Sequence, residues 1–149
     1  MTPQQLRDEL RVAMLARDTE KTSVLRMIIS AIQYYEINKG GAGYEATDED
    51  VLSVIGREVK QRRESIEQFQ NANRQDLVDK ETKELEILKV YLPEQMSEEE
   101  IRQLVQESIT QTGASSIQDI GKVMGNLMPK LKGKADGNLV NKLVRESLS

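Results

Sequence analysis

Apolar residues recur at three- and four-residue spacing along almost the whole chain, which is the pattern of amphipathic helices. Glycine, proline or short polar turns separate seven such stretches, and none alternates with the two-residue period of a strand. The sequence therefore predicts an all-α protein. We expect a four-helix N-terminal bundle in residues 1–93 and a compact three-helix C-terminal domain in residues 94–149.

Capping signals mark the starts of the N-terminal helices. Thr2 and Gln5 have the spacing of an N-cap and a capping box, and a second helix follows Asp18. The glycine-rich run 40–43 ends that helix, and Thr47 with Asp50 opens a long third one. The buried stripe expected for the first helix is Leu6, Leu10 and Met14.

The third helix carries a cluster of basic residues, namely Arg57, Lys60, Arg62 and Arg63. Glutamates lie nearby in the same helix, so the favoured interpretation is a solvated surface with ion pairs between residues four apart. The fourth helix ends at Leu92-Pro93, and Ser97 with Glu100 forms a capping box that starts the next one. We place the domain boundary between them, with limited hinge freedom because of the proline.

Residues 119–137 combine helix-weakening residues with positive charge. Gly121 and Gly125 interrupt an amphipathic helix, at about 1 kcal/mol each relative to alanine, and Pro129 is expected to take the following residues out of regular helix. Close approach of a neighbouring helix explains the two glycines more simply than approach of a ligand. Gly133 and Gly137 are interpreted as a turn and a helix start, and Asp136 as the cap of the last helix.

The charge of the chain is −4 overall but unevenly distributed. Residues 76–100 carry nine acidic side chains and three lysines, whereas residues 121–145 carry five lysines and one arginine against a single aspartate. The candidate RNA-binding residues are Lys122, Lys130, Lys132, Lys134, Lys142 and Arg145. Lysines beside the start of the last helix suit a phosphate site, although a solubilising surface loop explains them equally well.

The chain contains no cysteine and no histidine, which excludes a disulfide framework, a zinc site of the usual type and an imidazole base. We therefore expect no metal site and no cofactor. Ser115, Ser116 and Lys122 lack the glycine-rich context of a Ser-Ser-Lys amidase, so no catalytic residue is assigned. The polar N-terminus and the lack of a membrane-length apolar run favour a cytoplasmic protein without membrane contact.

Two segments carry a family resemblance. The run G-K-V-M-G-N-L-M-P-K-L-K-G-K-A-D-G (residues 121–137), preceded by L-P-E-Q-M-S-E-E-E-I (residues 92–101), closely resembles the GatB/YqeY family. That family includes free-standing YqeY-like proteins and the tail domain of the B subunit of the tRNA-dependent amidotransferase. Leu25-Arg26 and Ser30-Ala31-Ile32 look like the free-standing members, so the resemblance spans essentially the whole chain.

The resemblance implies an accessory protein that binds tRNA or another structured RNA through its C-terminal domain. Such a protein would have no amidotransferase activity by itself. Any association with carbon–nitrogen ligases that use glutamine as amide donor comes from the family, because the large catalytic region of the B subunit is absent. The alternative is an interaction module that docks a synthetase, an amidotransferase or another translation-related partner. A helical DNA binder is disfavoured, because no base-reading side chains gather on the last helix.

Overall fold

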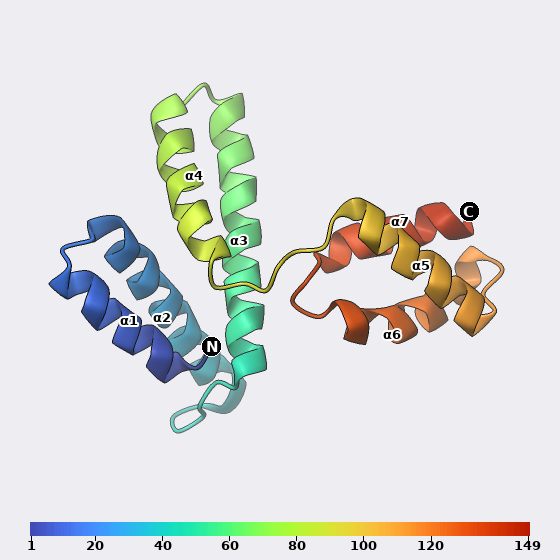
Figure 1. Cartoon of the computed structure of the whole chain (residues 1–149), viewed down its shortest axis with the longest axis horizontal. Helices are drawn as coiled ribbons and strands as arrows, with labels where there is room; N and C mark the ends of the chain where they lie inside the picture. Colours follow the sequence, from blue (N-terminus) through green and yellow to red (C-terminus); the bar gives the residue numbers. More distant parts are fainter. The chain divides into compact units, whose positions relative to one another are not determined.

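The computed structural model describes all 149 residues and contains seven α-helices and no strand, which confirms the predicted all-α class. The helices are α1 (Pro3–Leu15), α2 (Thr19–Gly40), α3 (Asp48–Asn71), α4 (Gln75–Lys89), α5 (Glu98–Thr112), α6 (Ile120–Leu131) and α7 (Gly137–Leu148). The chain divides into two compact units, Met1–Leu92 and Pro93–Ser149 (Figure 1). None of the helices combines the length and the apolar character needed to cross a membrane.

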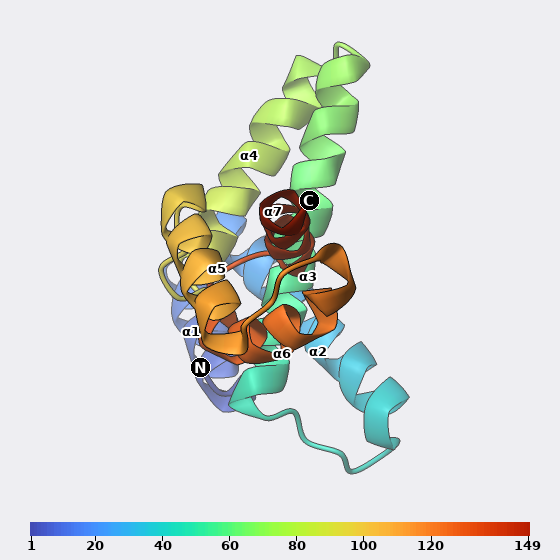
Figure 2. The same ribbon diagram turned by 90° about the vertical axis from the view of Figure 1, so that its right-hand side faces the viewer.

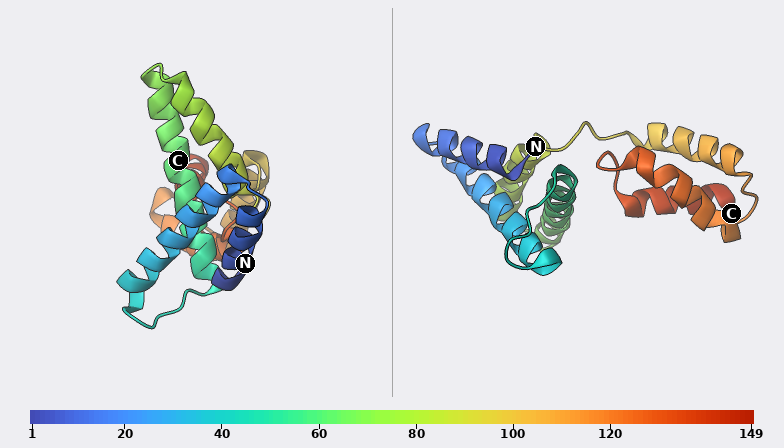
Figure 3. Two further views of the ribbon diagram at one scale, coloured as in Figure 1. Left: turned by 90° about the vertical axis from the view of Figure 1, so that its left-hand side faces the viewer. Right: turned by 90° about the horizontal axis from the view of Figure 1, so that it is seen from below.

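The first unit consists of two helical hairpins, α1 with α2 and α3 with α4, and α2 contacts both helices of the second hairpin (Figures 1 and 3). Its core is aliphatic and includes Leu6, Leu25, Ile28, Ile32, Val51, Ile55 and Leu88. The buried residues of α3 end at Val59, and Ile66 beyond it is only half-buried. The core therefore lies where the hairpins meet, and the far end of the α3–α4 hairpin contributes little to it.

Local signals account for the helix starts in this unit. Thr2 and Gln5 form the predicted capping box, Asp18 caps α2, and Thr47 forms a second capping box with Asp50. Arg17 lies in the turn between α1 and α2 with a left-handed backbone, at a φ of 57°. A left-handed backbone is unfavourable for any residue that carries a Cβ atom. Glycine would therefore be less strained than arginine at position 17.

Met14 does not belong to the buried stripe that the sequence predicted. Its side chain is 48% exposed, whereas Ala13 is 3% exposed and packs in the core. The correction follows from helical geometry, because Leu6, Leu10 and Ala13 stay on one side at 3.6 residues per turn. Met14 lies further round the helix, outside this buried side.

The predicted solvated basic surface is also wrong for Arg62. Its side chain is only 12% exposed and forms ion pairs with Glu81, at 2.7 Å, and with Glu84. Both acids belong to α4, so these pairs join two helices and are not pairs between residues four apart. Arg62 follows Val59 by three residues, which puts it on the face of α3 that packs against α4.

The second unit is built from α5, α6 and α7, each of which contacts the other two (Figures 2 and 3). Its core consists mainly of Ile101, Val105, Val123, Leu127, Leu131, Val140, Leu143 and Val144. Ser97 and Glu100 form the predicted capping box of α5, and Gly113 ends that helix with a φ of 68°. A short 3-10 turn, Ile117–Asp119, leads into α6.

Candidate nucleic-acid interface

The six basic residues proposed from the sequence lie on α6, on α7 and in the connection between these helices. All six side chains are exposed: Lys122, Lys130, Lys132, Lys134, Lys142 and Arg145. The apolar residues of the same elements are buried, because Val123, Leu127 and Leu131 face the core from α6. Burying the aliphatic stripe therefore leaves the cations pointing towards solvent.

Lys130 belongs to the last turn of α6, which corrects the expectation that Pro129 removes this segment from regular helix. The helix runs through Pro129 and ends only at Leu131. A proline inside a helix removes one backbone hydrogen bond and disfavours helical geometry before it. Burial of Leu127 and Leu131 on either side of Pro129 holds the final turn in place despite that loss.

Main-chain hydrogen bonds fix the connection that carries Lys132 and Lys134. The carbonyl of Lys134 accepts from the amide of Met96 at 2.9 Å, and the carbonyl of Gly133 accepts from the Gln95 side chain at 2.9 Å. The amide of Lys134 donates to Leu131 O, also at 2.9 Å, and Gly133 has a φ of 75°. The backbone is thus held by residues of the same unit, while both lysine side chains remain at the surface.

The start of α7 is not an open phosphate site. Asp136 caps the helix as predicted, and its carboxylate accepts a hydrogen bond from the amide of Asn138 at 2.9 Å. That carboxylate occupies the place where an anion would meet the helix N-terminus, and its charge would repel a phosphate. Anion binding here must therefore rely on lysine and arginine side chains. Gly137 is the first residue of α7, in line with its interpretation as a helix start.

Close helix packing does not explain Gly121 and Gly125, and this part of the sequence interpretation is wrong. A Cβ atom added at either position would meet no atom within 4 Å. Both glycines are exposed, as is Pro129, which follows Gly125 at the same four-residue spacing. Residues spaced by four share one face of a helix, so α6 presents a narrow outer strip without long side chains. Lys122 lies beside this strip in sequence.

Three of the exposed cations make only weak contacts within the chain. Lys130 donates to the side chain of Gln111 at 3.2 Å, and Arg145 donates to that of Asn141 at 2.8 Å. Lys122 lies 3.9 Å from Asp119, on the surface. Exposed pairs of this kind contribute little stability, so a phosphate could compete for these side chains at small cost.

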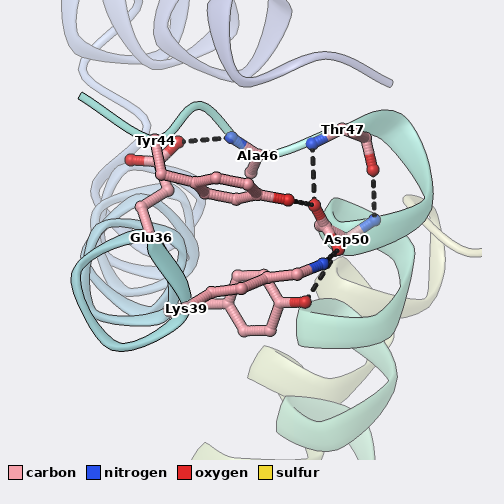
Figure 4. Close-up of polar contacts among 7 residues, drawn as sticks. Glu36, Lys39, Tyr44, Ala46, Thr47 and Asp50 are labelled. Carbon is pink, nitrogen blue, oxygen red and sulfur yellow. Dashed lines mark hydrogen bonds and ion pairs between the residues drawn. The ribbon is translucent and has the colours of Figure 1, made fainter. Parts of the chain in front are cut away.

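The first unit contains a polar cluster that the sequence reasoning missed. The carboxylate of Asp50 accepts hydrogen bonds from the hydroxyls of Tyr35 and Tyr44, both at 2.7 Å, and from Lys39 Nζ at 2.8 Å. The amide of Thr47 adds a fourth donor at 3.0 Å (Figure 4). Only the Thr47–Asp50 capping box was visible in the sequence. The four-residue spacing of Tyr35 and Lys39 was the remaining signal, since it puts both on one face of α2.

These contacts determine how Asp50 and Lys39 titrate. Lys39 foremost, and then Tyr44, hold the pKa of the Asp50 carboxyl far below its usual range. Asp50 in turn raises the pKa of Lys39 well above that of a free lysine. Because the carboxylate is already saturated with donors, the cluster fastens the connection between α2 and α3 and leaves no free group for catalysis.

The sequence model of the family described as Yqey-like protein matches residues 3–148. A protein of Pyrenophora tritici-repentis named "Altered inheritance of mitochondria protein 41, mitochondrial" is 34% identical over 147 residues, which cover 95% of this chain and 77% of the relative. Proteins of the same name from Clavispora lusitaniae and Saccharomyces cerevisiae are 38% and 32% identical. Those matches cover 66% and 82% of this chain, and 56% and 68% of the relatives.

These names contradict the cytoplasmic location that we expected, because all three relatives are described as mitochondrial. The expectation rested on a polar N-terminus without the apolar segment of a secretory signal. Mitochondrial targeting segments are amphipathic and rich in arginine, so the lack of an apolar segment does not argue against them. The inference was therefore not valid.

Proposed function

The chain belongs to the Yqey-like protein family, and on that premise we propose that it is an accessory RNA-binding protein. Its second unit would hold tRNA or another structured RNA on the surface formed by α6, α7 and the connection between them. The observation that carries this proposal is the gathering of six exposed cations on those elements in a chain whose net charge is −4. Contacts of lysine and arginine with phosphates supply most of the affinity of such interfaces.

The outer strip of α6 supports the same proposal. Gly121, Gly125 and Pro129 leave room for a bulky backbone to approach the helix, and Lys122 lies next to them in sequence. Double-stranded RNA is recognised largely through its shape and its sugar–phosphate backbone. A smooth strip flanked by lysines suits that mode of binding. Base stacking is a poorer match, since the second unit contains no aromatic residue at all.

The relation to the amidotransferase B subunit supplies the proposed setting. We propose that the protein assists a synthetase or an amidotransferase-type enzyme that acts on the bound RNA. Carbon–nitrogen ligase chemistry with glutamine as amide donor would then belong to the partner. In this proposal the first unit serves as a four-helix bundle for docking, and the second is a tail-like domain that folds independently.

Titration of fluorescent tRNA at several salt concentrations tests the proposal. Replacing Lys130, Lys132 and Lys134 together with glutamine should weaken binding and flatten its salt dependence. The log–log slope should fall by about two to three, since each phosphate contact contributes about 0.7 to 0.9. The melting temperature should stay nearly constant, because the three side chains are exposed.

The matched control is the triple glutamine variant at Lys80, Lys83 and Lys89, which removes the same charge from α4. It should bind tRNA like the parent protein. Equal weakening in both triple variants would show that only net charge matters. Absence of tRNA binding by the parent would leave the docking of a translation-related partner, without RNA affinity, as the better proposal.

A further inference from the structure

The connection between α2 and α3 folds back onto the end of α2. Tyr44 packs so closely on Gly40, the last residue of α2, that a Cβ atom added there would lie 2.7 Å from the Cβ atom of Tyr44. The amide of Ala46 donates to the carboxylate of Glu36, also on α2, at 2.8 Å (Figure 4). A side chain at position 40 would displace the tyrosine, so this closed form of the connection requires the glycine.

One positive charge lies at the centre of the closed form. Lys39 Nζ lies 2.8 Å from a carboxylate oxygen of Asp50. The same nitrogen is 5.3 Å from the ring centres of both Tyr35 and Tyr44. Aromatic rings attract a cation placed over their faces, so the two rings add to the attraction of the carboxylate. Lys39 comes from α2, Tyr44 from the connection and Asp50 from α3, so the ammonium group joins all three segments.

Asp50 has no second cation to replace Lys39. The guanidinium carbon of Arg57 lies 5.9 Å from the ring centre of Tyr35, but Arg57 forms no ion pair with Asp50. The Asp50 side chain is only 9% exposed. A carboxylate at such a site is costly once its cation is removed. Loss of the charge at position 39 should therefore favour an open form of the connection, in which water reaches Asp50 and Tyr44 leaves Gly40.

The amino group of Lys39 is accessible to reagents although it has partners. The side chain is 47% exposed. A lysine attacks an acyl carbon only after it has lost its proton, and the hydrogen bond to Asp50 raises the pKa of Lys39 above that of a free lysine. Lys39 is therefore unreactive in the closed form, and it becomes an ordinary surface lysine when the connection opens.

We propose that Lys39 is an acylation site, and that its modification keeps the connection between α2 and α3 open. The acyl donor is a thioester. The free amine of Lys39 attacks the carbonyl carbon, a C–N bond forms while the C–S bond breaks, and the thiol leaves with the proton of the amine. The product is a neutral amide, which cannot form the ion pair with Asp50 or the cation–π contacts. The acylated chain therefore cannot return to the closed form.

Acylation rates of single lysines in the full chain test the first half of the proposal. The reagent is the acetyl thioester of N-acetylcysteamine, and mass spectrometry of peptides follows each lysine over time. Lys39 should react more than about tenfold more slowly than Lys80, because a pKa raised by one already lowers the fraction of free amine by that factor. Lys80 is exposed and lies on α4.

Three variants relate the rate to the closed form. Gly40→Ala should raise the rate at Lys39 severalfold, because the new Cβ atom displaces Tyr44 without changing any charge. Asp50→Asn should bring the rate close to that of a free surface lysine. Gly56→Ala is the matched control, since a Cβ atom at that glycine of α3 would meet no atom within 4 Å, and it should leave Lys39 slow.

A side chain installed by chemistry tests the second half. The chain contains no cysteine, so Lys39→Cys provides a single thiol. Aminoethylation of this thiol restores an ammonium group, whereas N-acetylaminoethylation gives the neutral amide of an acetylated lysine. With the ammonium, the amide NMR signals of residues 41–47 should match those of the parent. With the amide group, they should shift, and chymotrypsin should cleave after Tyr44 severalfold faster. The signals of the second unit should stay in place.

Four results would overturn the proposal. Lys39 could react as fast as Lys80 in the parent, or its rate could be unchanged by Gly40→Ala; either result would show that the closed form does not protect the amine. Identical spectra and cleavage rates for the ammonium and amide forms would show that the connection stays closed without the charge. Loss of the signals of α1 to α4 in the amide form would make Lys39 a residue of general stability and not a site of local control.

Discussion

Tyr91 donates a hydrogen bond of 2.6 Å to Glu9, which lies 82 positions earlier in the chain. The bond joins α1 to the residues that follow α4, and so it ties the beginning of the first unit to its end. Tyr91 is 7% exposed, and Glu9 also lies 3.7 Å from Lys21. No local pattern in the sequence indicates this contact, because it depends on the packing of all four helices.

Tyr91→Phe should therefore destabilise the protein by about 0.5–1.5 kcal/mol, the usual contribution of one hydrogen bond. Burial, and secondly the bond to Glu9, raises the pKa of Tyr91 well above its ordinary value. A raised pKa means that the stabilisation is complete below about pH 10 and is lost as the pH rises beyond it. Melts between pH 8 and pH 11 should show a gap between parent and variant that narrows at high pH. Tyr34→Phe, at a side chain 73% exposed, is the control and should behave like the parent.

Asp50→Asn should lower the melting temperature at neutral pH, because the amide cannot accept from two tyrosines, a lysine and a backbone amide together. The folded pKa of Asp50 lies below the unfolded value, so its stabilisation is complete above about pH 4 and fades as the pH falls further. Melts from pH 7 downward should show the two proteins converging in acid. Asp48→Asn, which removes an exposed charge from the same helix start, should have a much smaller effect. A similar loss from both variants would argue against a special role of the cluster.

Arg62→Met should destabilise the first unit by about 3 kcal/mol, since it leaves two partly buried carboxylates without their cation. Adding Glu81→Gln and Glu84→Gln to that variant should restore much of the loss. Urea unfolding provides the measurement, and Arg63→Met, one residue further along α3 and exposed, provides the control. If Arg63→Met were equally destabilising, Arg62 would contribute only through the surface charge of α3 and not through its ion pairs with α4.

Gly125→Ala should stabilise the protein by about 0.5–1 kcal/mol, because the site is helical and open. Gly125→Leu should also be tolerated, as no neighbouring atom restricts it. If RNA approaches the outer strip of α6, the leucine variant should nevertheless bind tRNA more weakly. Melting temperatures and tRNA titrations of both variants decide the matter. If the leucine variant had a clearly lower melting temperature than the parent protein, close helix packing would again explain the glycine.

Residues 94–149 should fold without the first unit, since α5, α6 and α7 share their own core and cap their own ends. Domains of roughly this size are only marginally stable, so a low melting temperature is expected. A circular dichroism spectrum of the fragment should be helical and should melt cooperatively. A random-coil spectrum would show that the second unit depends on the rest of the chain.

Features set by neighbouring residues were predictable from the sequence. The capping boxes of Thr2, Thr47 and Ser97 each involve residues three apart, and all of them start helices as expected. The exposure of Lys122, Lys130, Lys142 and Arg145 also followed from periodicity, because the buried positions of α6 and α7 are aliphatic. Local spacing was sufficient in these cases.

Features that depend on other helices were not predictable. The sequence around Arg62 does not reveal that two glutamates of α4 meet it, and Asp50 gathers donors from α2 and from the connection before α3. Pro129 was misjudged for a similar reason, because buried leucines of α6 outweigh its local preference. Whether a neighbouring helix packs against Gly125 depends on the tertiary structure. The spacing of the glycines alone could therefore not distinguish close packing from open space.

The connection between α6 and α7 is held through its backbone, by the carbonyls of Gly133 and Lys134. Its shape therefore depends little on which side chain stands at position 134. Charge at that position can change while the loop keeps its form, so affinity for an anionic ligand becomes adjustable in small steps. The same arrangement makes the loop a practical site for an engineered label or reactive group, provided that Gly133 is left in place.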